Sequence, residues 1–548
     1  MSNNKRGYRD LQEHLDELRR ADLLHEIDEQ IDKDAEMHPL VRWQFRGGIA
    51  ENDRKAFLFT NIVDGKGRKF DIPVVVGAMA ASEDIYSIGM GVPTAEIAEK
   101  WKQAIANPIA AKQIQEAPCH DVIVEGEDLR RSEAGLDALP IPISTPGFDS
   151  TPTLTATNVI TRDPETGIQN MGTYRAGLKA PDRLVVRMAT RVGGAGGYLH
   201  WQKYKDRGEK MPCAIVLGCP PYVAFMGPQK MPIGVDEYDI AGGLAGKPIN
   251  VVTGKTVDLL VPAEAEVIIE GLIDPEYLEP EGPFGESHGH VALEEFNMPM
   301  TVTAITRKSN AVIPSYISQV TPSESSVIKR VAYEPLFLHH LQKDLNILGV
   351  RDVSLHEPLT SLLRVTIITM EEDTSETEIW RALYGAASFK GDFSKIVIAV
   401  NKDIDPKSTD ALFWAISYRA NPQADCQILP HRGQGHGPKR EHTGEQDSTL
   451  LINATMKSKM PPLALPTEPY MEKAKALWER LGLGPLKPES PWHGYSLGDW
   501  SEQWERDAVR AAGGDYLVNG TETLKRQIKA TVSPETSVRD VESGWDDS

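Results

Sequence analysis

The chain has 548 residues. This length exceeds what a single hydrophobic core can accommodate, so two or three domains are expected. Its formal net charge of −20 comes from 59 basic and 79 acidic residues. Such a surface repels phosphate backbones and anionic lipid headgroups, so neither nucleic acid nor a membrane is expected as a partner. The four cysteines lack CxxC spacing, and no apolar run approaches the ~18–20 residues of a membrane span. We therefore expect a cytoplasmic protein without a secretion signal.

The first 115 residues have an α/β pattern. Leucine and isoleucine recur at near-helical spacing between residues 9 and 33, which predicts an amphipathic opening helix. DIPVVVGAMA (71–80) predicts a strand, and TAEIAEKWKQAIANP (94–108) predicts a helix.

The next two hundred residues have a β pattern. A proline-rich connector at 138–153 should run extended or in turns. TLTATNVITR, the turn DPETG and IQNMGTYRAGL then predict a hairpin over 153–178. Four further strand-like segments follow: MPCAIVLG (211–218), INVVTG (249–254), DLLVPAEAEVIIEG (258–271) and MTVTAITR (300–307). A β-rich domain, either a sheet or a barrel, is expected.

After about Pro322, helical and strand-like segments alternate, which predicts βαβ units and a mainly parallel sheet. YMEKAKALWERLGLG (470–484) predicts a further helix that ends at a glycine. The glycine-rich, charged segment 431–447 predicts a loop.

The segment LEPEGPFGESHGH (278–290) places Glu281 and Glu286 five residues apart across GPFG. Proline fixes φ and glycine permits positive φ, so this backbone can direct both carboxylates into one space. Two carboxylates in a cleft suit proton transfer. The alternative is a tight surface turn with solvated acids. His288 and His290 are either metal ligands or, with no third ligand in view, a structural pair.

Three other segments contain polar candidates. Asn170 and Arg175 follow the hairpin turn, where an arginine either binds a carboxylate bidentately or pairs with a buried acid. RVGGAGGYLHWQKY (191–204) lacks the dinucleotide and P-loop fingerprints, so it is either a phosphate-approaching backbone or a flexible turn. His200 follows the glycine-rich run, and Glu237 lies in another turn-rich segment. An ion shared by these oxygen and nitrogen donors would be Mg²⁺ or Mn²⁺ rather than structural zinc.

EGPFGE followed by SHG, with Asn170 five residues before Arg175 and MPIGVDE at 231–237, resembles the UbiD family of reversible (de)carboxylases that use prenylated FMN. The resemblance runs from about residue 71 to about residue 485. It implies an α/β plus β, three-domain architecture that forms a homodimer or higher homo-oligomer. The parts would be an N-terminal α/β domain (1–115), a central split β-barrel domain that binds the flavin (116–320), a C-terminal α/β dimerisation domain (321–485) and an extension (486–548).

The resemblance also implies roles for individual residues. Asn170 and Glu237 match metal ligands that bridge to the cofactor phosphate through Mn²⁺ or Mg²⁺, with K⁺ beside it, and His200 is the proposed third ligand. Arg191 is then a candidate phosphate contact. The expected flavin-lining residues are Thr173, Tyr174, Arg175, Arg187, Met188 and Ala189.

Arg175, Glu281 and Glu286 match the family's catalytic network. Arg175 would pair with Glu281 and orient the substrate carboxylate, while Glu286 would protonate the carbon after CO₂ leaves. Burial and the neighbouring Glu281 would raise the pKa of Glu286.

The implied function is that of a carboxy-lyase. It would reversibly decarboxylate a small aromatic, heteroaromatic or α,β-unsaturated acid through a covalent adduct with prenylated FMN, which a flavin prenyltransferase would supply. An aryl-CoA thioester such as phthaloyl-CoA is an alternative substrate. A metal-dependent hydrolase built on His288, His290 and Glu286 is a competing hypothesis from a different enzyme class. A non-catalytic subunit is another, and it would be expected to lack the Arg-Glu-Glu set.

Overall fold

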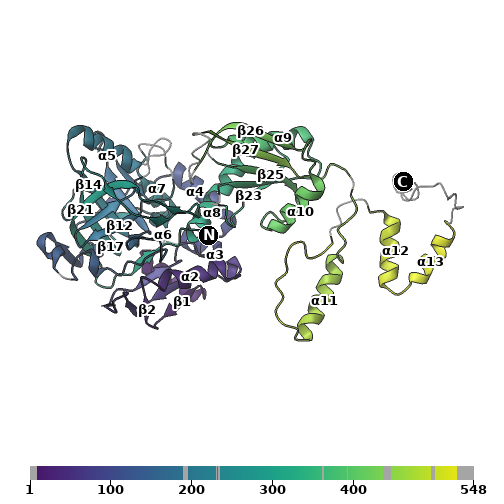
Figure 1. Cartoon of the computed structure of the whole chain (residues 1–548), viewed down its shortest axis with the longest axis horizontal. Helices are drawn as coiled ribbons and strands as arrows, with labels where there is room; N and C mark the ends of the chain where they lie inside the picture. Colours follow the sequence, from purple (N-terminus) through teal and green to yellow (C-terminus); the bar gives the residue numbers. More distant parts are fainter. Residues whose placement is uncertain are drawn as a thin grey trace. The chain divides into compact units, whose positions relative to one another are not determined.

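The computed structural model describes residues 9–131, 133–188, 196–229, 231, 235–360, 363–391, 393–435, 446–458, 460–494 and 500–526. The described parts of Met1–Lys402 and Ile416–Ala454 form one compact unit, and those of Asp403–Ala415 and Thr455–Ser548 form a second (Figure 1). None of the helices in these ranges combines the length and apolar composition that crossing a membrane requires.

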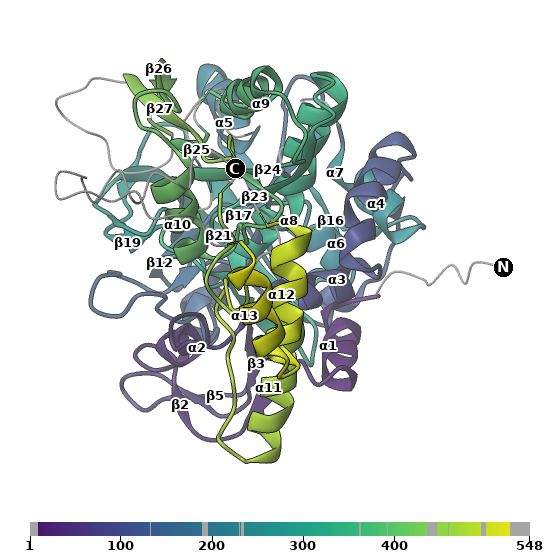
Figure 2. The same ribbon diagram turned by 90° about the vertical axis from the view of Figure 1, so that its right-hand side faces the viewer.

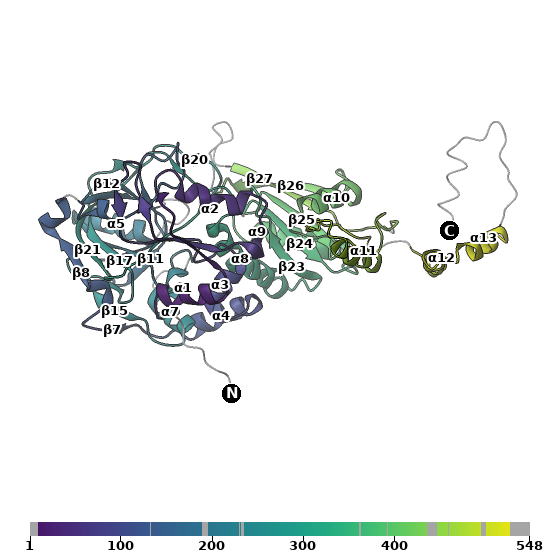
Figure 3. The same cartoon turned by 90° about the horizontal axis from the view of Figure 1, so that it is seen from below.

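The N-terminal part contains two small sheets and four helices. The first sheet has the order β1 (Leu24–Ile27), β3 (Ala56–Phe59), β6 (Val74–Val76) and β22 (Ile313–Ser315), and the second has the order β2 (Ile31–Asp32), β4 (Ile62–Val63) and β5 (Lys69–Phe70). The helices are α1 (Leu11–Arg20), α2 (Met37–Arg46), α3 (Glu83–Met90) and α4 (Thr94–Ala106). Helix α1 packs beside α3, and α3 beside α4 (Figure 3). The predicted strand within 71–80 and helix within 94–108 are therefore present.

The prediction of one helix over residues 9–33 is wrong beyond Arg20. Asp10 caps α1 by accepting a hydrogen bond from the Glu13 N–H, and the helix ends where Asp22 takes φ +57°, a left-handed conformation. Leu24–Ile27 then pairs in parallel with β3. The helix-like leucine spacing continued across this break because the strand also directs apolar side chains toward the core.

A ten-stranded antiparallel sheet dominates the middle of the chain. Its main order is β11 (Gln169–Gly172), β10 (Thr157–Arg162), β14 (Met211–Leu217), β17 (Val267–Ile273), β21 (Phe296–Arg307), β13 (Arg183–Val186), β12 (Ala176–Ala180) and β9 (Thr153–Leu154); β8 (Val122–Glu125) and β18 (Glu279–Pro280) also pair with β21. The predicted hairpin is confirmed, because β10 pairs with β11 and places Thr161 opposite Asn170. Within the described residues no pairing joins β11 to β9, so the split β-barrel stays a prediction.

Shorter elements border this sheet. The strands are β16 (Leu260–Pro262), β15 (Asn250–Thr253) and β7 (Lys112–Gln113), in that order, and the pair β19 (Phe284–Gly285) and β20 (Val291–Ala292). The helices are α5 (Gly196–Arg207), α6 (Pro221–Ala224) and α7 (Glu237–Ala245). Helix α7 packs against α4 and α6 (Figure 2).

The C-terminal sheet is mixed rather than mainly parallel. Its order is β23 (Val350–Leu355), β24 (Val365–Met370), β25 (Ile396–Asn401), β27 (Gln446–Asn453) and β26 (Cys426–Gly433). The two central pairings are parallel, and both edge strands are antiparallel to their neighbours. Helix α9 (Glu376–Ser388) forms the predicted βαβ connection from β24 to β25, and α8 (Glu324–His339) packs against β23. Both ends of the loop predicted at 431–447 belong to strands, and 436–445 lie outside the described residues.

Buried apolar side chains form two main clusters. The larger one joins the N-terminal sheets and helices to the ten-stranded sheet, and the smaller one lies between the C-terminal sheet and helices α8 and α9. The remaining helices are α10 (Thr409–Arg419), α11 (Glu468–Arg480), α12 (Glu502–Ala512) and α13 (Tyr516–Leu524), of which α11 corresponds to the helix predicted at 470–484.

Candidate active site

The segment 278–290 contains two short strands: β18 pairs with β21 of the large sheet, and β19 pairs with β20 in a separate two-stranded sheet. The Glu281 N–H donates to the Glu295 carbonyl oxygen at 2.9 Å, and the Glu286 N–H donates to the His290 carbonyl oxygen at 2.9 Å. Gly282 between them has φ +91°, a conformation that favours glycine. The carboxylates are therefore held by a paired backbone, and both are buried rather than solvated as the surface-turn alternative required.

Arg175 contacts both carboxylates. Its Nε and Nη2 donate to the two oxygens of Glu281 at 2.5 and 2.9 Å, which is a bidentate pair, and its Nη1 donates to Glu286. The guanidinium also lies over the Phe284 ring, 4.4 Å from its centroid. Burial alone would lower the pKa of Arg175, but the two carboxylates reverse this effect and raise it. Arg175 therefore contacts both of the glutamates that were predicted to form a catalytic network with it.

A second arginine lies beside this group. Arg187 Nη1 is 3.3 Å from Glu286 Oε1, and its Nη2 is 3.1 Å from Glu295 Oε2. Sequence reasoning placed Arg187 on a flavin-lining strand, whereas its described side-chain contacts are with these two acids. Glu286 therefore lies between two guanidinium groups.

The predicted metal ligands line one cavity of about 1400 Å³. Asn170 is on β11, His200 is on α5 and Glu237 is the first residue of α7. Thr161 lies opposite Asn170 in the β10–β11 register, and its hydroxyl is 2.9 Å from His200 Nδ1, which places the imidazole beside Asn170.

The chemistry of these three side chains fits a divalent cation. Burial raises the pKa of Glu237 to about 7, and a nearby cation would restore its ionised form. Burial lowers the pKa of His200 to about 4, which keeps its imidazole neutral, as metal ligation requires. The buried Asn170 Nδ2 has no hydrogen-bond partner among the described residues. Oxygen and nitrogen donors without thiolate suit Mn²⁺ or Mg²⁺.

The other predicted cofactor contacts divide into three groups. Thr173 and Tyr174 line the cavity, where the Tyr174 hydroxyl accepts a hydrogen bond from the Gly197 N–H at 3.3 Å. Met188 is buried and is not part of the cavity lining. Ala189 and Arg191 lie outside the described residues.

The group of Arg175, Glu281 and Glu286 adjoins this cavity without lining it. Arg175 directly follows Tyr174, and Lys329 on α8 lines the cavity and interacts electrostatically with Glu286. Asn297 donates to Glu281 at 3.1 Å, and Asp149 accepts from the Gly285 N–H at 3.1 Å. Sequence reasoning missed Lys329, Asn297 and Asp149, because each lies in a segment with an ordinary helix, strand or connector pattern.

The hydrolase hypothesis gains no support. His290 is exposed, and its ring lies 5.5 Å from that of His288. In the ranges that the structure describes, no three His, Cys, Asp or Glu side chains gather as metal ligands would.

Comparison with solved structures identifies similar folds. The UbiD-class enzyme HmfF from Pelotomaculum thermopropionicum in complex with FMN is 27% identical with a TM-score of 0.72, over 82% of this chain and 95% of that one. An evolved dimeric form of HmfF in complex with prFMN is 27% identical with a TM-score of 0.70, over 84% and 97%. The vanillic acid decarboxylase of Sedimentibacter hydroxybenzoicus shares the fold at 22% identity with a TM-score of 0.70, over 87% and 100%.

Three domain models of one family, 3-octaprenyl-4-hydroxybenzoate carboxy-lyase (UbiD), match the sequence. The N-terminal domain matches residues 15–105, the Rift-related domain 112–320 and the C-terminal domain 327–456. The models follow one another along most of the chain, and the fold agrees with that of UbiD-class enzymes, so the protein belongs to the UbiD family of carboxy-lyases.

Proposed function

We propose that this carboxy-lyase reversibly decarboxylates an aromatic, heteroaromatic or α,β-unsaturated carboxylic acid with prenylated FMN as its cofactor. The observation that carries the proposal is the buried contact of Arg175 with both Glu281 and Glu286, beside a large cavity. The cofactor assignment is supported by the FMN and prFMN complexes of HmfF. The split-barrel form of the central domain, a neighbouring K⁺ and a homo-oligomeric state belong to the same proposal.

The cavity residues fit such a cofactor. Asn170, His200 and Glu237 would hold Mn²⁺ or Mg²⁺ against the cofactor phosphate, while Thr173 and Tyr174 would line the rest of the group. When bound, prenylated FMN supplies the electron sink that an sp²-bound carboxylate requires in order to leave.

The proposed roles of the chain's own residues follow from charge and contact. The Arg175 guanidinium is planar and carries several N–H donors, so it can orient the substrate carboxylate while it stays paired with Glu281. Glu286 contacts the guanidinium groups of both Arg175 and Arg187 in the present arrangement. A substrate carboxylate that draws Arg175 away from Glu286 would remove one of these cations and let Glu286 take up a proton from water. Glu286 can then donate its proton to the carbon that has lost CO₂.

The first experiment tests the whole proposal. The protein is co-expressed with a flavin prenyltransferase, its absorbance spectrum is recorded, and CO₂ release is screened over phenolic, heteroaromatic and unsaturated acids, with an aryl-CoA thioester as a further arm. We expect a bound modified flavin and CO₂ release from at least one free acid. A flavin-free protein that hydrolyses esters or amides would contradict the proposal.

Glu286→Gln tests the proton donor. The variant should retain flavin and metal but lose H/D exchange at the reacting carbon, because the amide keeps the shape and lacks a transferable proton. Exchange is followed by NMR on the acid found in the screen. Glu279→Gln is the matched control, since Glu279 is in the same loop and pairs with Arg183 at 3.4 Å. Exchange by Glu286→Gln at a near wild-type rate rejects the role.

Glu237→Ala tests the metal site. The variant should purify with little bound Mn, because Glu237 is the only carboxylate among the three proposed ligands. Elemental analysis measures Mn per chain. Glu264→Ala, which removes a carboxylate bonded to Asn250 at 2.7 Å, should retain the metal. Full Mn occupancy in Glu237→Ala would show that the ligand assignment is wrong.

A further inference from the structure

A hydrogen-bonded series of three buried side chains, His38, Ser315 and Thr155, connects helix α2 to the wall of the cavity. His38 Nε2 is 2.9 Å from Ser315 Oγ, and Ser315 Oγ is 3.1 Å from Thr155 Oγ1. The three residues are 1%, 3% and 8% exposed, and Thr155 lines the cavity. They come from three segments far apart in sequence, and sequence reasoning singled out none of them.

The hydrogen-bonded series lies at the end of the cavity that is nearest the proposed catalytic network of Arg175, Glu281 and Glu286. Thr155 directly follows Leu154, which pairs with Ala176, the residue after Arg175. The side chain beside the metal ligands is Thr161, six residues farther along, and the part of this separation that lies in β10, from Thr157 to Thr161, spans roughly 13 Å at the rise of an extended strand. A flavin bound by its phosphate at Asn170, His200 and Glu237 would therefore direct its ring toward Thr155.

The hydrogen bonds in this series have one favoured direction. Burial lowers the pKa of His38 to about 3, so its ring is neutral and carries a single N–H. His38 Nδ1 is buried and has no hydrogen-bond partner among the described residues. A buried N–H without an acceptor is the costlier arrangement, so the proton belongs on Nε2, where Ser315 Oγ accepts it.

The direction then continues to Thr155. With its oxygen accepting from His38, the Ser315 hydroxyl proton is free to donate to Thr155 Oγ1. Thr155 Oγ1 also accepts from the Tyr316 N–H at 2.8 Å. A hydroxyl offers two acceptor positions and one proton, so the proton of Thr155 remains for the occupant of the cavity.

We propose that Thr155 donates a hydrogen bond to an acceptor atom of the flavin ring, a carbonyl oxygen or a ring nitrogen, and that His38 and Ser315 are positioning residues that fix this direction. The inference rests on the proposed function, because it needs a flavin in the cavity.

The test measures FMN binding to the full-length protein with Mn²⁺, by fluorescence quenching and by the visible absorption bands of the bound flavin. Thr155→Val keeps the shape and removes the hydroxyl, so the Kd should rise about fivefold and the bands should shift. Thr155→Ser should restore both. Ser315→Ala and His38→Phe should each raise the Kd by about two- to threefold. If Ser315 and His38 act through the Thr155 hydroxyl, combining either substitution with Thr155→Val should raise the Kd no further than Thr155→Val alone.

His14→Phe is the matched control. His14 is also a fully buried histidine, but its Nε2 bonds to the Ala78 carbonyl oxygen at 2.7 Å, so its substitution should lower the Tm and leave the flavin Kd and bands unchanged. The tautomer of His38 is measured in the wild-type protein, and a variant is needed only to assign its resonance. In ¹⁵N-histidine-labelled protein, the resonance that changes in Ser315→Ala should show a protonated Nε2.

The possible outcomes distinguish a failure of this inference from a failure of the proposed function. Wild-type protein that binds no flavin overturns this inference and the proposed function together. Flavin binding with wild-type Kd and bands in Thr155→Val, or a protonated Nδ1 on His38, overturns only the inference.

Discussion

Glu324, the first residue of helix α8, is a fully buried carboxylate without a guanidinium or ammonium group in contact among the described residues. Its Oε1 accepts from the Met79 and Ala80 N–H groups at 2.9 and 3.3 Å, which connects α8 to the segment after β6. Burial raises the pKa of Glu324 to about 7 in spite of these bonds. The residue therefore binds a proton more tightly in the folded chain than in the unfolded chain.

This pKa makes stability depend on pH. Because the folded-state pKa lies above the unfolded value of 4.5, the contribution of Glu324 is fully present below about pH 4.5 and is lost as pH rises through about 7. Glu324→Gln does not titrate, so its free energy of unfolding relative to wild type should increase by up to ~3 kcal/mol between pH 4.5 and 8. Urea unfolding at a series of pH values measures this difference. A constant difference across the range would contradict the assignment.

At the scale of the element, the loop at 278–290 depends on close packing beneath Gly285. A Cβ at this position would lie 2.5 Å from Thr145 Oγ1 and 2.8 Å from Gln319 Cγ. The Gly285 N–H also donates to Asp149, so the loop cannot move without losing this bond. Because Gly285 has no side chain, the loop can approach the connector at 138–153 closely. This approach places Glu286 beside Arg175.

Gly285→Ala should therefore reduce catalysis more than stability. The extra methyl displaces the loop, and a misplacement of about 1 Å can cost about 100-fold in rate, so kcat/KM should fall by roughly that factor. Steady-state kinetics with the acid found in the screen measures it. Gly391→Ala is the control, because a Cβ there meets nothing within 4 Å. Unchanged kinetics in Gly285→Ala would show that the loop tolerates the shift.

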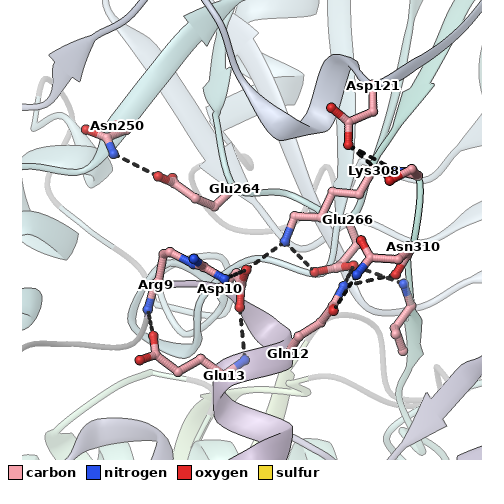
Figure 4. A network of polar contacts seen from close by, with 12 residues as sticks. Arg9, Asp10, Gln12, Glu13, Asp121, Asn250, Glu264, Glu266, Lys308 and Asn310 are labelled. Carbon is pink, nitrogen blue, oxygen red and sulfur yellow. Dashed lines mark hydrogen bonds and ion pairs between the residues drawn. The ribbon is translucent and has the colours of Figure 1, made fainter.

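At the scale of the whole molecule, a buried ionic network fastens the N-terminal helix to the large sheet (Figure 4). Lys308, directly after β21, bonds to Glu266 at 2.8 Å and to Asp10, the cap of α1, at 3.0 Å. Gln12 and the Val312 N–H also donate to Glu266, at 2.9 and 3.0 Å. The network connects α1, β17 and β21, which are far apart in sequence.

Removal of its central cation should be costly. Lys308→Met leaves the fully buried Glu266 without a cation, and breaking a buried pair in this way typically costs about 3–5 kcal/mol. The unfolding midpoint in urea measures the loss. Arg351→Met, which breaks the exposed 3.5 Å pair with Glu371, should cost at most about 1 kcal/mol. Equal effects of the two substitutions would contradict a stabilising role for the network.

The sequence predicted local elements well where one periodicity dominates. Helix α4 and the β10–β11 hairpin lie where their patterns placed them, and β24–α9–β25 is one of the βαβ units predicted after Pro322. The prediction was wrong at residues 21–33 because leucine spacing does not reveal the left-handed Asp22 that ends α1. It was wrong about the C-terminal sheet because the alternation of elements does not determine the direction of edge strands.

Part of the site could be predicted from the sequence alone. The glycines and proline of EGPFGE restrict the backbone locally, so this segment indicated that two carboxylates could be held together. The hairpin pattern placed Asn170 and Arg175 in the same β-rich domain. Only the tertiary structure brought residue 175 into contact with residues 281 and 286, since strand pairing over a hundred residues is set by core packing. The same packing placed Arg187 and Lys329 beside Glu286 and joined His38, Ser315 and Thr155 into one hydrogen-bonded series. No local pattern encodes these contacts, because each depends on where two distant segments meet.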